Sequence, residues 1–178
     1  MLNDGVLRLR ALEPTDLDLL TKWENDTSLW SATDTVSPLS RAALWRYLQN
    51  DVGDFYRQGE LRLVAELVDT GEAVGMVDLR EYSALNNRAE LGLTIAAAHR
   101  GKGLSKRALC LTLDYAVNHL GLHQVYAIVP ADNAASRAML AACGFESGGV
   151  LRQWVRRGRG YRDAELWQYL PPIKGVRG

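Results

Sequence analysis

The sequence predicts an α/β (α+β) fold with a mixed, mostly antiparallel, splayed central sheet of about seven strands and helices on both faces. Two patterns favour this class. Runs of alternating apolar and polar residues outnumber runs with helical periodicity. Only the segment over 87–129 reads strand–helix–strand, the order that joins parallel neighbours by a right-handed crossover. The 178 residues contain no repeat and no Pro/Ser linker, so we expect a single domain over 1–178.

The first half of the chain is expected to carry most of the antiparallel strands. Pro14 suits the first turn of a helix, and Leu17, Leu20 and Trp23 then share one helical face. The turn over 69–72 joins two alternating runs and predicts a hairpin. In order, the expected elements are a strand over 6–10, a helix from Pro14, a helix over 40–51, strands over 61–68 and 73–80, and a strand over 87–95.

In the second half of the chain, the spacing of apolar residues changes from strand alternation to a helical period. A wide apolar stripe runs from Leu104 to Leu120, and Gly121 is suited to end that helix. Residues 125–129 are all apolar, as in a buried strand, and a helix to about Ala142 follows with Asp132 or Asn133 as its cap. The last expected elements are strands over 145–152 and 161–170 around an arginine-rich tip.

The composition, 47% hydrophobic and 24% charged, is that of a globular protein and excludes a disordered chain. No window holds the roughly 20 apolar residues of a membrane-spanning helix, and residues 1–10 lack the apolar core of a signal peptide. Cys110 and Cys143 are too few for a disulfide framework or a cysteine zinc site. Both lie among apolar helix residues, so we interpret them as core thiols. We expect a reduced, cytoplasmic location.

The charges cancel over the chain but not locally. Residues 1–90 hold 9 Lys and Arg against 16 Asp and Glu, while residues 91–178 hold 12 against 5. The basic half would suit an anionic ligand and the acidic half a cationic one. A solvated surface on both halves explains the pattern equally well.

The segment from His99 to Ser105 joins a strand to a long helix and is suited to hold a phosphate. Amides of a first helical turn lack backbone partners, and the positive end of the helix dipole attracts anions. Gly101 and Gly103 allow a sharp turn and a close approach to a ligand. The alternative is a plain glycine turn with solvated basic residues. The sequence patterns of P-loops and of dinucleotide-binding loops are absent.

Four segments in order give the chain a family resemblance. They are Leu7–Arg10; Arg100-x-x-Gly103-x-Ser105; Asn133-x-x-Ser136 with Cys143-Gly144-Phe145; and Gly148-Gly149-Val150 with Tyr161-Arg162-Asp163-x-x-x-Trp167. Together they resemble the GNAT superfamily of N-acetyltransferases, in the branch of ribosomal-protein N-terminal acetyltransferases and spermidine acetyltransferases. This implies an acyl-CoA N-acyltransferase-like fold and acetyl-CoA as the cosubstrate, with no metal.

The resemblance also implies which residues bind the coenzyme. Backbone amides would hold its pyrophosphate, the preceding strand would pair with the pantetheine arm, and Asn133 would contact the pantetheine or phosphate end. Asn133 could equally be only a helix cap. Ser105 departs from the usual Gly or Ala, although a small hydroxyl still fits. The implied set is Leu93, Thr94, Ile95, Arg100, Gly101, Lys102, Gly103, Leu104, Ser105 and Asn133.

The implied reaction passes acetyl directly from the thioester to a primary amine, so a base must first deprotonate that amine. Glu90 is the candidate, because alternation places it on the strand face opposite Ala89 and Leu91; the alternative is a carboxylate paired with Arg88 or Arg80. Ser136 is the candidate acid for the leaving thiolate. Tyr126 and Tyr161 are weaker substitutes, since the family's usual tyrosine position holds Leu140 here. The three histidines lack a metal-ligand spacing.

The acceptor stays open between a polyamine, a protein N-terminus and another small amine. We expect the acceptor to lie over a slot formed by the N-terminal helices and the final hairpin. Trp23, Trp30, Trp45 and Tyr56 occur there with Glu24, Asp26, Asp34 and Asp54, although core packing explains the tryptophans better. The alternative function is a non-catalytic module of the same fold that contacts RNA or protein through Arg152, Arg156, Arg157, Arg159 and Arg162. We expect no membrane and no direct nucleic-acid contact. A homodimer stays open.

Overall fold

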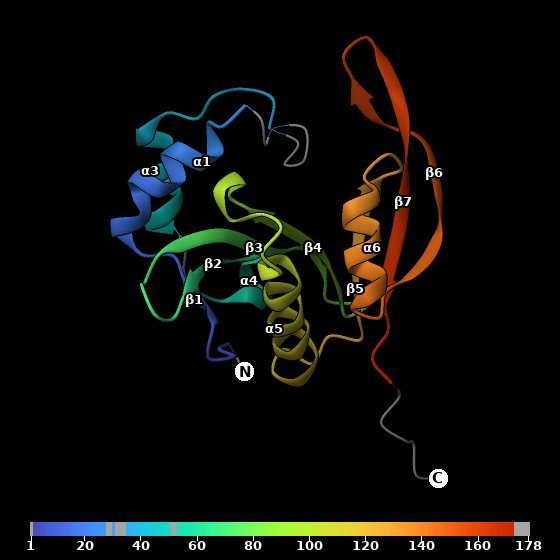
Figure 1. Cartoon of the computed structure of the whole chain (residues 1–178), viewed down its shortest axis with the longest axis horizontal. Helices are drawn as coiled ribbons and strands as arrows, with labels where there is room; N and C mark the ends of the chain where they lie inside the picture. Colours follow the sequence, from blue (N-terminus) through green and yellow to red (C-terminus); the bar gives the residue numbers. More distant parts are fainter. Residues whose placement is uncertain (1, 28–29, 31–34, 51–52, 173–178) are drawn as a thin grey trace.

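The computed structural model describes residues 2–27, 30, 35–50 and 53–172. Its seven strands form one sheet in the order β1-β2-β3-β4-β5-β7-β6 (Figure 1). Neighbours pair antiparallel except β4 and β5, which are parallel and are joined by a helix. The strands are β1 (Leu7–Ala11), β2 (Leu61–Leu67), β3 (Ala73–Ser83), β4 (Arg88–Ile95), β5 (Gln124–Pro130), β6 (Glu146–Arg157) and β7 (Gly160–Tyr169). The predicted sheet and its single parallel crossover are confirmed.

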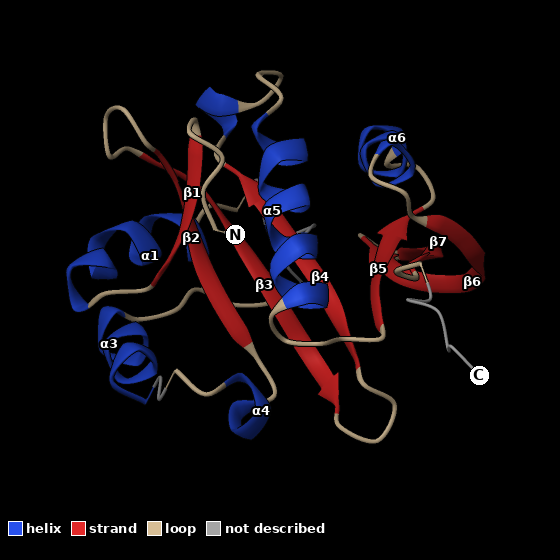
Figure 2. Ribbon diagram, turned by 90° about the horizontal axis from the view of Figure 1, so that it is seen from below, coloured by secondary structure: helices blue, strands red, loops and turns tan. Residues whose placement is uncertain are grey.

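Helices pack on both faces of the sheet (Figure 2). They are α1 (Leu17–Glu24), α3 (Arg41–Asn50), α4 (Phe55–Gln58), α5 (Leu104–Asn118) and α6 (Ala134–Ala142), with one-turn 3₁₀ segments at Pro14–Asp16 and Ala97–His99. The α5 side chains join the main core with apolar residues of β1 to β5. Leu20, Trp23 and Leu44 of α1 and α3 form a second core against Met76 of β3. The opening that forms the site lies within the sheet, where β4 and β5 part.

The two helical layers are assigned to opposite faces by strand alternation. Along β4, Ala89, Leu91 and Ile95 join the core under α5, so Glu90 and Thr94 point to the other side. Thr94 is the register partner of Met76, which packs under α1 and α3. Glu90 therefore lies on the α1/α3 face, as the sequence predicted from alternation.

The predicted elements agree with the observed ones except at two places. The short helix α4 was not predicted, because four residues cannot show a helical period; Asp54 caps its start and Gly59, with φ of 74°, ends it. The last hairpin is also longer than predicted, since β6 continues to Arg157. None of the described helices is long and apolar enough to cross a membrane.

The interpretation of both cysteines as core thiols is wrong for Cys110. This residue lies on the outward side of α5 and is exposed, while Cys143, at the end of α6, is partly buried against the main core. The apolar neighbours of Cys110 in sequence occupy the opposite, buried side of the same helix. The two Sγ atoms are 4.0 Å apart, which also places α5 and α6 on the same side of the sheet.

Candidate functional site

The sheet opens between β4 and β5. Their parallel pairing covers only three register positions and ends at Glu90 opposite Tyr126. Beyond that point β5 remains paired with β7, up to Pro130. Parting of two parallel neighbours within a sheet leaves a wedge that side chains must line, so the predicted splay is confirmed.

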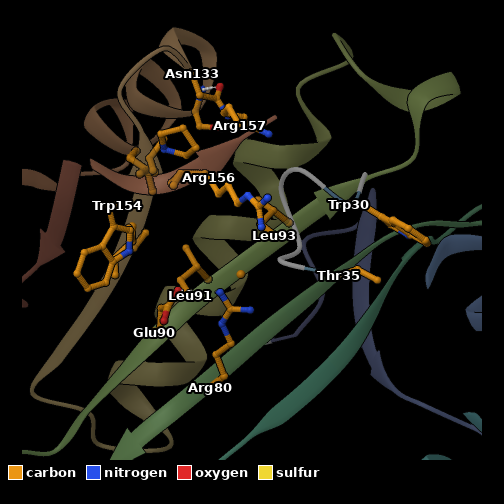
Figure 3. A pocket seen from close by; sticks show the side chains of 18 of the residues that line it. Trp30, Thr35, Arg80, Glu90, Leu91, Leu93, Asn133, Trp154, Arg156 and Arg157 are labelled. Atoms are coloured by element: carbon orange, nitrogen blue, oxygen red, sulfur yellow. Dashed lines mark hydrogen bonds and ion pairs between the residues drawn. The ribbon is translucent and has the colours of Figure 1, made fainter. Parts of the chain in front are cut away.

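A cavity of about 830 Å³ occupies this wedge (Figure 3). Segments far apart in the sequence line it, from β4, β5, α6, the β6–β7 hairpin and the stretch before α3. The lining residues are Trp30, Thr35, Val36, Arg80, Glu90, Leu91, Gly92, Leu93, Ala127, Ile128, Val129, Pro130, Asn133, Ser136, Met139, Leu140, Trp154, Val155, Arg156, Arg157 and Gly158. Its size and mixed lining suit a small-molecule site.

Glu90 borders the cavity from its narrow end. Its side chain is only 12% exposed and accepts a 2.8 Å hydrogen bond from Nη2 of Arg80, its register partner on β3. The structure therefore contains the ion pair that the sequence left open as the alternative to a catalytic role. The two are compatible, because both side chains line the cavity. The arginine holds a mostly buried carboxylate in a fixed position.

Tyr126 lies beside Glu90 in the parallel register. Burial raises the pKa of its phenol, and the negative charge of Glu90 raises that pKa further. The cavity is lined by residues 127–130, which follow Tyr126 on β5. Tyr161, the other substitute acid, is 57% exposed on the terminal hairpin and contributes nothing to the lining.

The predicted phosphate loop lies at the start of α5. Gly101 and Gly103 have φ values of 75° and 76°, and Gly103 is the residue before the first helical turn. No side chain caps this helix end, and a Cβ added to either glycine would meet no atom within 4 Å. First-turn amides have no partners within their own helix. This end of α5 is thus open on its outer side and has amides available for an anion.

Side chains around this loop are partly engaged elsewhere. Arg100 donates from Nε to the carbonyl oxygen of Ile95 at 3.0 Å, and Leu104 is buried in the main core. Arg107 pairs with Asp4 at 2.8 Å. Lys102 is exposed and Ser105 is partly buried in the first turn. The loop therefore offers an anion mainly backbone groups, as predicted.

The predicted coenzyme residues fall into two places. Leu93 and Asn133 line the cavity, whereas Thr94, Ile95 and all six residues of the loop over 100–105 lie outside its lining. Asn133 also caps α6, since its Oδ1 accepts a 3.1 Å hydrogen bond from the amide of Ser136. Ser136, the candidate acid, lines the cavity in the first turns of the same helix.

Most of the aromatic and acidic residues expected near the acceptor lie elsewhere. Among those that the structure describes, only Trp30 lines the cavity, and its Nε1 donates to the carbonyl oxygen of Glu24 at 2.9 Å. Trp23 is in the second core, and the carboxylate of Glu24 pairs with Arg62. Asp54 caps α4. Asp34 lies outside the described residues.

The β6–β7 hairpin lines the cavity, as expected for a wall of the acceptor slot, but sequence reasoning did not assign its side chains to that slot. Trp154, Arg156 and Arg157 line it, although the arginines were considered only as a surface for RNA or protein. Apolar and polar residues come in pairs over 150–157 rather than in alternation, so no strand period predicted that β6 continues to Arg157 and reaches the wedge. In the stretches described, no group of three or more His, Cys, Asp or Glu side chains is placed to hold a metal ion.

Comparison with known proteins identifies relatives of the whole fold. Residues 7–146 match a family model described as an acetyltransferase (GNAT) domain. The spermidine N(1)-acetyltransferase of Vibrio cholerae is 29% identical over 92% of this chain and 92% of its own length. The enzyme of the same name from Escherichia coli K12 is 30% identical over 89% and 82%. A candidate ribosomal N-acetyltransferase of Bacillus subtilis, YdaF, is 28% identical over 82% and 81%.

A solved structure shows the same similarity. The Vibrio cholerae spermidine N-acetyltransferase in complex with CoA and spermine superposes with a TM-score of 0.85 at 27% identity, covering 94% of this chain and 96% of that one. A dodecameric form of the same enzyme gives 0.80 at 28% identity, covering 94% and 95%.

Proposed function

Because the chain belongs to the GNAT acetyltransferase family, and is thus an acetyl-CoA-dependent N-acetyltransferase, we propose that it transfers acetyl to a primary amine in the β4–β5 cavity with Glu90 as the base. One observation carries the proposal. The only carboxylate among the described lining residues lies where the two strands part. An amine that enters the wedge reaches this carboxylate at its narrow end.

The α5 loop is suited to the phosphates of acetyl-CoA. Its positive-φ glycines leave the outer side of the loop open, and the first-turn amides have no partners in the helix. We propose that residues 100–105 bind the pyrophosphate, that backbone groups over 93–95 pair with the pantetheine arm, and that Asn133 donates its amide NH₂ to the same arm. When bound, acetyl-CoA supplies the activated thioester.

Glu90 would remove a proton from the incoming ammonium group. A primary amine of this kind has a pKa near 10 (about 10.4 for a lysine side chain), so it arrives charged. It cannot attack the thioester until it loses a proton. A carboxylate first attracts the cation and then accepts the proton. The Arg80 guanidinium fixes the position of the carboxylate.

Ser136 is proposed as the donor to the departing thiolate. Its hydroxyl belongs to the first turns of α6, on the cavity wall formed with Asn133. Tyr126, the register partner of Glu90 just outside the cavity lining, is the second candidate. Comparison of Ser136→Ala with Tyr126→Phe would separate the two. The variant that lacks the true donor should lose turnover while it binds acetyl-CoA normally.

The names of the relatives make a polyamine the first acceptor class to test. A protein N-terminus is second, because YdaF is named for ribosomal substrates. The test is an acetyl-transfer screen over polyamines, peptides and amino sugars that follows release of free coenzyme thiol. Turnover with any primary amine supports the proposal, and its absence with all of them would leave the non-catalytic module.

Glu90→Gln tests the base directly. We expect kcat to fall by about a hundredfold or more, with little change in affinity for acetyl-CoA, because general base catalysis contributes about 10²–10⁴-fold. Glu81→Gln is the matched control, since Glu81 is an exposed glutamate on β3 whose charge also reaches Tyr126. An equal loss in both variants would point to a general charge effect and refute the assignment.

We also propose that the chain self-associates, since a relative of the same fold forms a dodecamer. Val150 and Leu170 are large apolar side chains left 60% and 56% exposed at the β6–β7 end of the sheet, and they support a contact between copies there. Light scattering on the protein as it elutes from a size-exclusion column would test this by measuring the mass of the assembly.

A further inference from the structure

We propose that the acceptor amine carries a carboxylate and that Arg156 and Arg157 bind it. This inference rests on the proposed function and narrows its acceptor. It predicts a substrate unlike the polyamine that two of the relatives are named for.

The charges around the cavity are the first observation. Among the described lining residues, Arg80, Arg156 and Arg157 are cationic and Glu90 is anionic (Figure 3). The ion pair with Glu90 neutralises Arg80. Two positive charges therefore remain on the hairpin side of the cavity, and they favour an anionic group there.

The bonding of these two arginines is the second observation. Arg157 is partly buried, and Arg156 is exposed at the rim of the cavity. Two further partly buried arginines are matched by carboxylates: Arg62 by Glu24 and Asp78, and Arg137 by Glu165. In the described ranges neither Arg156 nor Arg157 forms an ion pair. The only hydrogen bond of their guanidinium groups there joins Nε of Arg156 to the carbonyl oxygen of Gly158 at 3.3 Å. Both can thus offer their planar forks to a ligand carboxylate.

A bulge in β6 places Arg156 and Arg157 over the wedge. The β6–β7 register shifts between Leu151 and Val155, which marks a bulge in β6. Within it Gln153 has a φ of 50°, and its amide donates to Oδ1 of Asp163 at 2.7 Å. Such a bulge bends a strand and redirects its side chains. Here it turns residues 154–158 toward the cavity.

A polyamine is a poor match for this arrangement. Its several ammonium groups would meet two arginines and one carboxylate that is already paired. Two of the described carboxylates expected near the acceptor are engaged elsewhere: Glu24 pairs with Arg62, and Asp54 caps α4. Trp30 and Trp154 add apolar surface to the lining, which suits the carbon skeleton of an amino acid or peptide.

A competing role for the arginines is to hold the phosphates of the cosubstrate. The structure separates the two functions, because none of the residues 100–105 of the phosphate loop lines the cavity that Arg156 and Arg157 border. Arginines that hold the phosphates would change the KM for acetyl-CoA, whereas arginines that bind the acceptor would change the KM for the amine.

The test compares acceptors that differ only in one terminal group. The series is 5-aminopentanoate, pentylamine and 1,5-diaminopentane; phenylalanine and phenethylamine; and tetrapeptide amides that begin with Glu or Gln. Spermidine is included as the polyamine. We expect the best carboxylate-bearing acceptor to exceed its matched partners in kcat/KM at least tenfold.

Arg156→Gln and Arg157→Gln should then raise the KM for that acceptor roughly tenfold to a hundredfold. The KM for its uncharged partner and for acetyl-CoA should not change. Arg159→Gln, at the hairpin tip outside the lining, is the matched control and should behave as wild type.

Three results would overturn the inference: a preference for spermidine or the diamine, equal rates within each matched set, or a raised KM for acetyl-CoA in the arginine variants. The first two leave the proposed function standing, since acetyl transfer to an amine would have been measured. Absence of transfer to every amine in the series would overturn the proposed function as well.

Discussion

Gly103→Trp probes the phosphate loop most directly. Gly103 precedes α5 with a φ of 76°, and a Cβ built on it meets no atom within 4 Å. A side chain at this position therefore enters the open space on the outer side of the loop. If the pyrophosphate binds there through backbone amides, an indole ring and the ligand must compete for one volume.

The two consequences of this change have separate magnitudes. A left-handed backbone costs a residue with a Cβ about 1–2 kcal/mol. For a chain of this length that lowers Tm by roughly 2–8 °C. Each hydrogen bond to a charged phosphate contributes about 1.5–3 kcal/mol, so loss of two such bonds weakens coenzyme binding at least about a hundredfold.

Gly121→Trp is the matched control. Gly121 lies just beyond the other end of α5, also with positive φ (65°) and with nothing within 4 Å of an added Cβ. Both variants should lose similar stability in thermal unfolding, but only Gly103→Trp should lose CoA affinity by isothermal titration calorimetry. Equal CoA affinity in the two variants would refute the assignment of the loop.

Two further predictions concern groups outside the cavity. Glu66 is a buried carboxylate bonded by two β1 arginines, chiefly Arg10, and these hydrogen bonds lower its pKa. Glu66→Gln should lower the free energy of unfolding by about 1.5–3 kcal/mol, measured by urea unfolding at pH 7. A lowered carboxyl pKa stabilises the fold above the group's ordinary pKa, and this contribution fades as the pH falls. The difference from wild type should therefore shrink at pH 3, and a constant difference would count against the ion network. Burial, with a smaller effect of the neighbouring Cys110, raises the pKa of the Cys143 thiol to about 11. At pH 8 its thiolate fraction should therefore be about a hundredfold below that of an ordinary thiol. Rapid labelling of Cys143 by iodoacetamide, detected by mass spectrometry, would contradict this.

The parts of the fold predicted from sequence are those with a long and regular pattern. The stripe of α5 and the alternation of the strands each extend over many residues, so the period identifies them. The helix α4 is one turn long and gives no period. The bulge at Gln153 depends on a hydrogen bond to Asp163, ten residues away, and no local pattern contains it.

The two halves of the candidate site differ in the same way. The phosphate loop is contiguous, and its glycines and helix start can be recognised from neighbouring residues. The acceptor side is assembled from Trp30, Arg80 and the hairpin residues 154–158, which only the sheet topology brings together. Sequence reasoning therefore identified the contiguous loop as a candidate phosphate site but considered the hairpin arginines only as a surface for RNA or protein.

The position of Glu90 follows from the geometry of β4 rather than from its residue type alone. On the face of β4 that carries Glu90, Arg88 lies within the paired stretch, opposite Gln124. At Gly92 an added Cβ would lie 3.3 Å from both Cβ and Oδ2 of Asp78, so a larger side chain is crowded out. Thr94 lies outside the cavity lining. Position 90 is thus the place on this face where a carboxylate both fits and borders the opening, and moving the acid to position 88 or 92 should not restore turnover to Glu90→Gln.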